Sequence, residues 1–166
     1  MKNMKGFTLF FAVLVGSLAL AVGVAIYDLT VRELQLSSVA TQSQYAIYAA
    51  DTGAECALYW DNHWVGGAYS SAFATSSTDT HWVGISGVNC NNQDVTSNWF
   101  VGGSGGASTG SSATTTFTLT FSPQPSCAKV TVAKSGNPSQ TTVVSHGYNT
   151  CASGGLQLER ALQVSY

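Results

Sequence analysis

The sequence has very few charged side chains. They make up 8% of its 166 residues, whereas about a quarter of the residues of an ordinary globular protein are charged. With six Lys and Arg against eight Asp and Glu, the chain lacks the clustered cations of a protein that binds nucleic acid. We therefore expect no nucleic-acid partner, and a surface made polar mainly by serine, threonine, asparagine and glutamine.

The sequence also lacks the short cysteine spacings of metal sites and redox motifs. No C-x-x-C pair occurs, and no cysteine stands near a histidine at zinc-finger spacing. An even number of cysteines in an exported domain is typical of disulfides. Four cysteines allow three pairings, of which we favour Cys56–Cys90 and Cys127–Cys151 because each closes a local loop. The alternative is four free, buried thiols in an intracellular domain.

Groups that could support catalysis are sparse. The histidines, His63, His81 and His146, are dispersed along the chain and form no recognisable triad or metal motif. Asp79 and Asp94 belong to one predicted loop region, but they lack the D-x-D-x-D-G pattern of a calcium loop. We therefore predict that the protein is not an enzyme and holds no metal and no cofactor.

A long run without charge follows the N-terminus. Phe7–Tyr27 contains 21 uncharged residues (27 − 6), about the number that a helix needs to cross a hydrocarbon core of ~30 Å. Lys2 and Lys5 precede this run, so the positive-inside rule keeps the N-terminus in the cytoplasm and exports the rest of the chain. The run is a membrane anchor, a secretory signal cleaved near Ala21, or the first half of a longer helix.

A helical pattern continues beyond the apolar run. Over residues 28–61 apolar side chains recur at spacings of three and four, and no proline or glycine cluster separates them from Phe7–Tyr27. Gly53 weakens this helix by about 1 kcal/mol relative to alanine. We predict one helix, apolar all round over its first half and amphipathic over its second, which ends near Trp60–Asn62.

The start of this helix resembles the processing site of type IV pilins and of type II secretion pseudopilins. In Lys5-Gly6-Phe7-Thr8-Leu9 a short basic leader ends at a glycine, and Phe-Thr-Leu opens the apolar segment. The resemblance implies that a membrane-bound prepilin peptidase removes residues 1–6 by cutting after Gly6, and then methylates Phe7. A glycine suits this position, because no side chain hinders an extended backbone in the peptidase.

The resemblance is strong over about residues 1–60, and it also implies partners and a location. Such a subunit first spans the inner, cytoplasmic membrane once, in contact with the lipid bilayer. An assembly platform in that membrane then moves it into a filament of other pilin subunits, extracellular or periplasmic.

One position departs from the family pattern. Major subunits carry glutamate at the fifth mature position, where it pairs with the N-terminal amine of a neighbour, but the fifth residue counted from Phe7 is Phe11. A charge in the membrane is costly without a partner, so this pairing can guide docking. Glu33 is 22 residues further on (33 − 11), ~33 Å along a helix, and cannot replace it. The departure implies a minor subunit, such as the tip pseudopilin, or a lineage that assembles without the pair.

The C-terminal part of the chain alternates as β-strands do. Period-two patterns mark strands at 114–121, 127–134, 141–148 and 156–166. Short connections favour antiparallel neighbours, so we predict an α+β fold in which the long N-terminal helix packs on a four-stranded antiparallel sheet formed by 114–166. Arg160 interrupts the apolar parity of the last strand, which indicates a bulge or an ion pair with a helix carboxylate.

Residues 62–113 separate the predicted helix and sheet. They include the Gly/Ser-rich tract Val101–Ser112, which predicts a flexible connection; it lacks the Lys-Ser/Thr ending of a phosphate loop. The region also holds several aromatic residues, namely Trp64, Tyr69, Phe73, Trp82, Trp99 and Phe100. These side chains either fix the loop to the domain or form an adhesive face for a glycan or a partner protein. The second alternative would make the protein a membrane-anchored binding module.

Overall fold

A computed structural model describes residues 5–64, 71–75, 86–104, 112–135, 140–152 and 154–166. Its contacts divide the chain into two units, Met1–Thr41 and Gln42–Tyr166. One helix, α1 (Lys5–Asn62), makes up the described part of the first unit and opens the second. Its last residue, Asn62, lies where the sequence predicts the helix to end.

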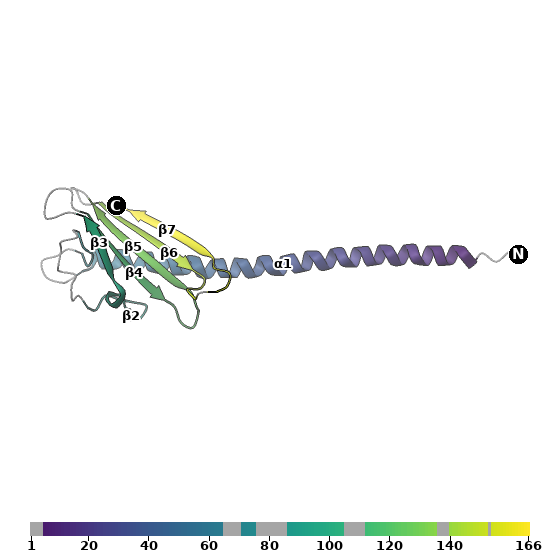
Figure 1. Ribbon diagram of the computed structural model, residues 1–166, viewed down its shortest axis with the longest axis horizontal. Coiled ribbons are helices and arrows are strands. Elements are labelled where there is room, and N and C mark those ends of the chain that lie inside the picture. Colours follow the sequence, from purple (N-terminus) through teal and green to yellow (C-terminus); the bar gives the residue numbers. More distant parts are fainter. Residues whose placement is uncertain (1–4, 65–70, 76–85, 105–111, 136–139, 153) are drawn as a thin grey trace. The chain divides into compact units, whose positions relative to one another are not determined.

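The second unit contains a five-stranded antiparallel sheet (Figure 1). Its strands are β3 (Phe100–Ser104), β4 (Ser112–Thr120), β5 (Cys127–Ser135), β6 (Gln140–Tyr148) and β7 (Glu159–Ser165). They pair in the order of the sequence, each with the next. The α+β fold is confirmed, but the sheet has one strand more than the four predicted.

The additional strand is β3, which begins at Phe100 and continues into the Gly/Ser-rich tract. Glycine has low strand propensity and supplies no alternating side chains, so the composition concealed the strand. It pairs along β4, from Phe100 opposite Thr116 to Ser104 opposite Ser112. Residues 105–111 of the tract lie outside the described residues.

A short hairpin precedes this sheet in the region that the sequence predicted to be loop. It consists of β1 (Asn89–Cys90) and β2 (Gln93–Asp94), followed by the 3₁₀ helix η1 (Val95–Asn98). Its two turn residues, Asn91 and Asn92, have φ values of 49° and 59°. Asparagine tolerates this left-handed conformation, and a two-residue hairpin turn of this kind requires it at both positions.

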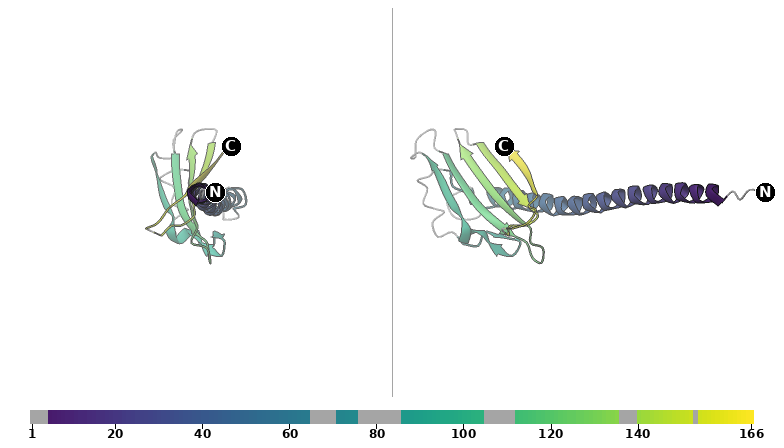
Figure 2. Two further views of the ribbon diagram at one scale, coloured as in Figure 1. Left: turned by 90° about the vertical axis from the view of Figure 1, so that its right-hand side faces the viewer. Right: turned by 45° about the vertical axis from the view of Figure 1, so that its right-hand side comes forward.

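The C-terminal part of α1 packs on one face of the sheet (Figure 2). A Cβ atom on Gly147 of β6 would lie 2.0 Å from the carbonyl oxygen of Ala46 and 2.4 Å from the amide nitrogen of Ala50. On the helix, a Cβ on Gly53 would lie 2.5 Å from the Ser145 hydroxyl oxygen. The glycine that weakens the helix in isolation therefore lets it approach the sheet closely.

The core lies between this helical segment and the sheet. Inward strand residues are fully or almost fully buried, among them Phe117, Leu119, Val130, Val132 and Val143. One disulfide, Cys56–Cys90, joins α1 to β1, and the other, Cys127–Cys151, joins the start of β5 to the segment before β7. These are the two pairings that local loop closure favours.

Candidate functional site

The apolar half of α1, Phe7–Tyr27, buries none of its large side chains among the described residues. Its large side chains are exposed throughout, for example Phe7 at 66% and Phe11 at 59%. None of its most apolar stretch is buried. By length and composition, α1 is the one described helix that could cross a membrane. A continuous apolar surface of this kind indicates that lipid or another protein covers it.

The predicted processing residues lie at the start of this helix. α1 begins at Lys5, so Gly6 and Phe7 belong to its first turn. That turn contains no acidic residue, and no carboxylate there offsets the positive end of the helix dipole. The first turn of a helix also has unpaired backbone N–H groups.

The hydroxyl groups of Ser17, within the apolar half, and of Thr30, just beyond it, donate to the carbonyl oxygens of the helix itself. The Ser17 hydroxyl donates to the Leu14 carbonyl oxygen at 2.9 Å, and Thr30 donates to Ile26 at 2.8 Å. Such bonds remove the need for a partner in a medium without water. Charge returns directly after Tyr27, where the Asp28 carboxylate lies 3.1 Å from Arg32.

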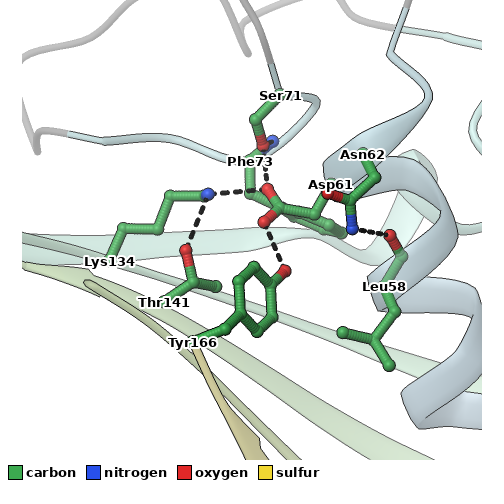
Figure 3. Close-up of polar contacts among 8 residues, drawn as sticks. All are labelled: Leu58, Asp61, Asn62, Ser71, Phe73, Lys134, Thr141 and Tyr166. Carbon is green, nitrogen blue, oxygen red and sulfur yellow. Dashed lines mark hydrogen bonds and ion pairs between the residues drawn. The ribbon is translucent and has the colours of Figure 1, made fainter. Parts of the chain in front are cut away.

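A polar network around the buried pair of Asp61 and Lys134 joins the last turn of α1 to the sheet (Figure 3). The Asp61 Oδ1 atom lies 2.6 Å from Lys134 Nζ, which also donates to the Thr141 hydroxyl oxygen at 3.1 Å. The Tyr166 hydroxyl donates to Asp61 Oδ2 at 2.6 Å, and the Ser71 hydroxyl donates to Oδ1. Both carboxylate oxygens are thus occupied, which marks this network as structural.

The network also sets the protonation states of its members. Burial alone would raise the pKa of Asp61, but hydrogen bonds from Lys134, Ser71 and Tyr166, together with the charge of Lys134, lower it below its ordinary value. Burial, and then the hydrogen bond to Asp61, raise the pKa of Tyr166. At neutral pH Asp61 is therefore ionised, while Tyr166 keeps the proton that it donates.

These residues were not predicted from the sequence, although one signal was present. Lys134 shares the inward parity of Val130 and Val132 in β5, and a lysine at such a position needs an acidic partner on the element that covers it. The partner, Asp61, receives its other hydrogen bonds from a loop and from the last residue of the chain, which only the fold brings together.

Arg160 in β7 makes neither of the two arrangements expected for it. The pairing of β6 with β7 runs one for one from Tyr148 opposite Glu159 to Thr142 opposite Ser165, so the strand has no bulge. Arg160 Nε donates to the hydroxyl oxygen of Ser43 on α1 at 2.9 Å. A helix hydroxyl therefore takes the place of the expected helix carboxylate.

The histidines form no common site within the described part of the chain. His63 stacks on Tyr59 with ring centroids 4.6 Å apart, and His146 Nδ1 lies 2.5 Å from Glu159 Oε1. His81 is outside the described residues. No group of three or more His, Cys, Asp or Glu side chains able to hold a metal is present among the residues that the structure describes.

The aspartates considered for calcium do not meet in the described structure. Asp94 accepts hydrogen bonds from the hydroxyl and the amide of Thr96 and from the amide of Gly87, and these bonds lower its pKa. It thereby caps η1. Asp79 is outside the described residues.

Most of the described aromatic residues of the connecting region pack onto the core. Phe73 is 1% exposed and lies against Phe117 and Trp99, with ring centroids 6.1 and 5.4 Å away. Trp64 and Trp99 are partly buried against the same core, whereas Phe100 is 69% exposed. Tyr69 and Trp82 lie outside the described residues.

Comparisons of this chain with protein-family models, with curated proteins and with solved structures find no match.

Proposed function

We propose that this protein is a structural subunit of a type IV pilus-like or type II secretion filament, assembled through α1 after cleavage of the leader at Gly6. The observation that carries the proposal is the exposed apolar half of α1, which continues into the segment that packs on the sheet. The motif from Lys5 to Leu9 supports the same proposal.

In this proposal the apolar half of α1 moves from lipid to a protein environment. In the cytoplasmic membrane, lipid covers the apolar half of α1, and in the filament the corresponding helices of other subunits replace the lipid. Gly16 and Gly23 suit this exchange, because a Cβ atom at either position would meet nothing within 4 Å and the surface there is open for a neighbouring helix.

The second unit has the properties of a head domain that must stay folded outside the cell. Two disulfides close it, in keeping with an oxidising environment. The small-residue contact between α1 and the sheet and the buried network of Asp61 fix the helix to the head. In this proposal the head follows α1 into the filament, and the partners are the prepilin peptidase, the assembly platform and other pilin subunits.

Phe11 supports a minor rather than a major subunit. It is the fifth residue of the proposed mature chain, it is 59% exposed, and it cannot pair with the amine of a neighbour as a glutamate does. A subunit without that carboxylate enters the filament at a position where no such pair is required, and the tip is one such position.

Electron microscopy of sheared filaments tests the proposal. The subunit carries a small epitope tag in the native host, and gold-labelled antibody locates it. Label at one end of each filament identifies a tip subunit, and label along the shaft identifies a major one. Label that stays with the membrane fraction and never with a filament would contradict the proposal.

A further inference from the structure

A groove of about 370 Å³ lies where the last turns of α1 meet the β1–β2 hairpin. Its volume falls in the range of roughly 300–1,000 Å³ that is usual for small-molecule sites. Tyr59 and Trp60 contribute aromatic surface from the helix, Glu55 contributes a carboxylate, and Asn89 and Asn91 contribute amide groups from the hairpin. Neither the filament role nor the buried network uses these side chains.

The aromatic wall of the groove is formed in advance. The Tyr59 ring is stacked on His63, with planes 8° from parallel, and it meets Trp60 edge to face at 5.4 Å between centroids. The Trp60 Nε1 group donates to the carbonyl oxygen of Asn89 at 3.2 Å. Tyr59 is nevertheless 55% exposed. A ligand would therefore find an ordered aromatic surface and would lose little affinity in ordering it.

The opposite wall is fixed as well. The disulfide Cys56–Cys90 ties the hairpin to the helix, and both cysteines line the groove. Asn91 donates through Nδ2 to the carbonyl oxygen of Thr120 at 3.4 Å. The other amide atom of this side chain, Asn91 Oδ1, accepts no hydrogen bond from a described residue. The exposed carboxylate of Glu55 likewise makes no hydrogen bond or ion pair with a described side chain.

The charge of the groove restricts the ligands that it can take. Glu55 is the one charged residue in its lining, and Asp51 lies one helical turn away. No cation lines the groove, so a phosphate, a sulfate or an acidic sugar would meet a negative potential with nothing to offset it.

We propose that this groove binds a neutral carbohydrate. A pyranose presents an apolar face of C–H groups, which suits the Tyr59 ring, and a rim of hydroxyl groups that both donate and accept. The carboxylate of Glu55 and the Oδ1 atom of Asn91 accept from such hydroxyls. The proposal is independent of the filament role, because every residue that carries it lies in the second unit.

A glycan-binding assay on the full chain tests this proposal. The protein is kept in a detergent without a sugar headgroup, because an alkyl glycoside would compete for the groove. It is applied to a printed array of neutral and acidic glycans, and the neutral glycan retained best is then titrated in solution. We expect retention of neutral glycans and none of acidic ones.

Matched substitutions assign the binding to the groove. Tyr59→Ala should weaken the affinity roughly three- to tenfold, while Tyr48→Ala removes another exposed tyrosine from the same helix and should leave the affinity unchanged. Glu55→Gln should also weaken binding, whereas Asp51→Asn, which removes the same charge one turn away, should not. Near-ultraviolet circular dichroism confirms that each variant is folded.

Three results would overturn the proposal. The first is retention of no neutral glycan above the level seen with Tyr59→Ala. The second is a preference for acidic glycans. The third is an equal loss of affinity in the groove variants and in their controls. None of these results bears on leader cleavage or on assembly, so the filament proposal stands or falls separately.

Discussion

The Asp61 carboxylate and the Lys134 ammonium lie 2.6 Å apart, and their side chains are only 5% and 9% exposed. The end of α1 therefore cannot leave the sheet without separating a buried ion pair. A buried ion pair adds little net stability, because the cost of desolvating both charges offsets their attraction. Removal of one partner nevertheless leaves the other charge buried without compensation. In a filament, any force on α1 would reach the head through this contact and through the small-residue contact around Gly147.

Loss of one member of this pair should destabilise the head strongly. Lys134→Met leaves Asp61 buried without its cation, and we expect the free energy of unfolding to fall by roughly 3–5 kcal/mol. Denaturant titration followed by tryptophan fluorescence measures the change. In the double variant Asp61→Asn/Lys134→Met no charge is stranded, so much of the loss should be recovered. An unchanged unfolding midpoint in the single variant would argue against the network.

The stability of the head should depend on pH in two ranges, through Asp61 at acidic pH and through Tyr166 at alkaline pH. The pKa of Asp61 lies below its ordinary value of 3.8, so its contribution is complete above that pH and is lost as the pH falls further. The pKa of Tyr166 lies above its ordinary value of 10.0, so its contribution is complete below that pH and is lost as the pH rises.

Substitution of the tyrosine isolates the alkaline part of this dependence. Tyr166→Phe removes the titrating hydroxyl, and we expect the variant to be less stable at neutral pH but to lose less stability above pH 10 than the parent protein. Denaturant midpoints measured across this range provide the comparison. Parallel curves for the two proteins would show that Tyr166 makes no such contribution.

The close approach of α1 to β6 should make Gly147 intolerant of any side chain. A Cβ atom there would overlap the backbone of Ala46 and Ala50, which cannot move aside without moving the helix. We expect Gly147→Ala to cost about 3 kcal/mol of unfolding free energy, the upper end of the range usual for an overpacked site. Thermal unfolding monitored by circular dichroism measures it, and an unfolding temperature equal to that of the parent would refute the packing.

Two other glycines serve as controls for this experiment. Gly53→Ala should cost less, because the atoms nearest to its Cβ, the Ser145 hydroxyl oxygen at 2.5 Å and a Val130 methyl at 2.8 Å, belong to side chains and not to backbone. Alanine also strengthens the helix by about 1 kcal/mol. Gly23→Ala should leave the stability of the head unchanged, since a Cβ atom there meets nothing within 4 Å.

The parts of the fold that follow from the sequence are those with a regular pattern. The end of α1 and the strands β4 to β6 follow from their periodicity, and the disulfide pairs follow from local loop closure. The strand β3 could not be predicted in this way, because Gly102 and Gly103 carry no side chain that could show an alternating pattern. The buried role of Asp61 was hidden as well, since an aspartate near a helix end is by default solvated, and its partners come from distant parts of the chain.

Phe11 should control how the subunit enters a filament. We expect Phe11→Glu to leave the fold of the head unchanged, because Phe11 is 59% exposed and lies in the first unit. The added carboxylate could pair with the N-terminal amine of a neighbour, so the variant should shift from the tip toward the shaft. Gold labelling of filaments from strains with either protein measures this shift. Identical distributions would remove the main support for a minor subunit.

The mass of the mature protein tests the central proposal most directly. The protein is purified from its native membrane, and intact-mass spectrometry with N-terminal fragmentation identifies its first residue. The filament proposal predicts a chain that begins at Phe7 and carries one added methyl group on its N-terminal amine. A chain that begins at Val22, as a secretory signal cleaved after Ala21 would produce, or one that retains Met1, would contradict it.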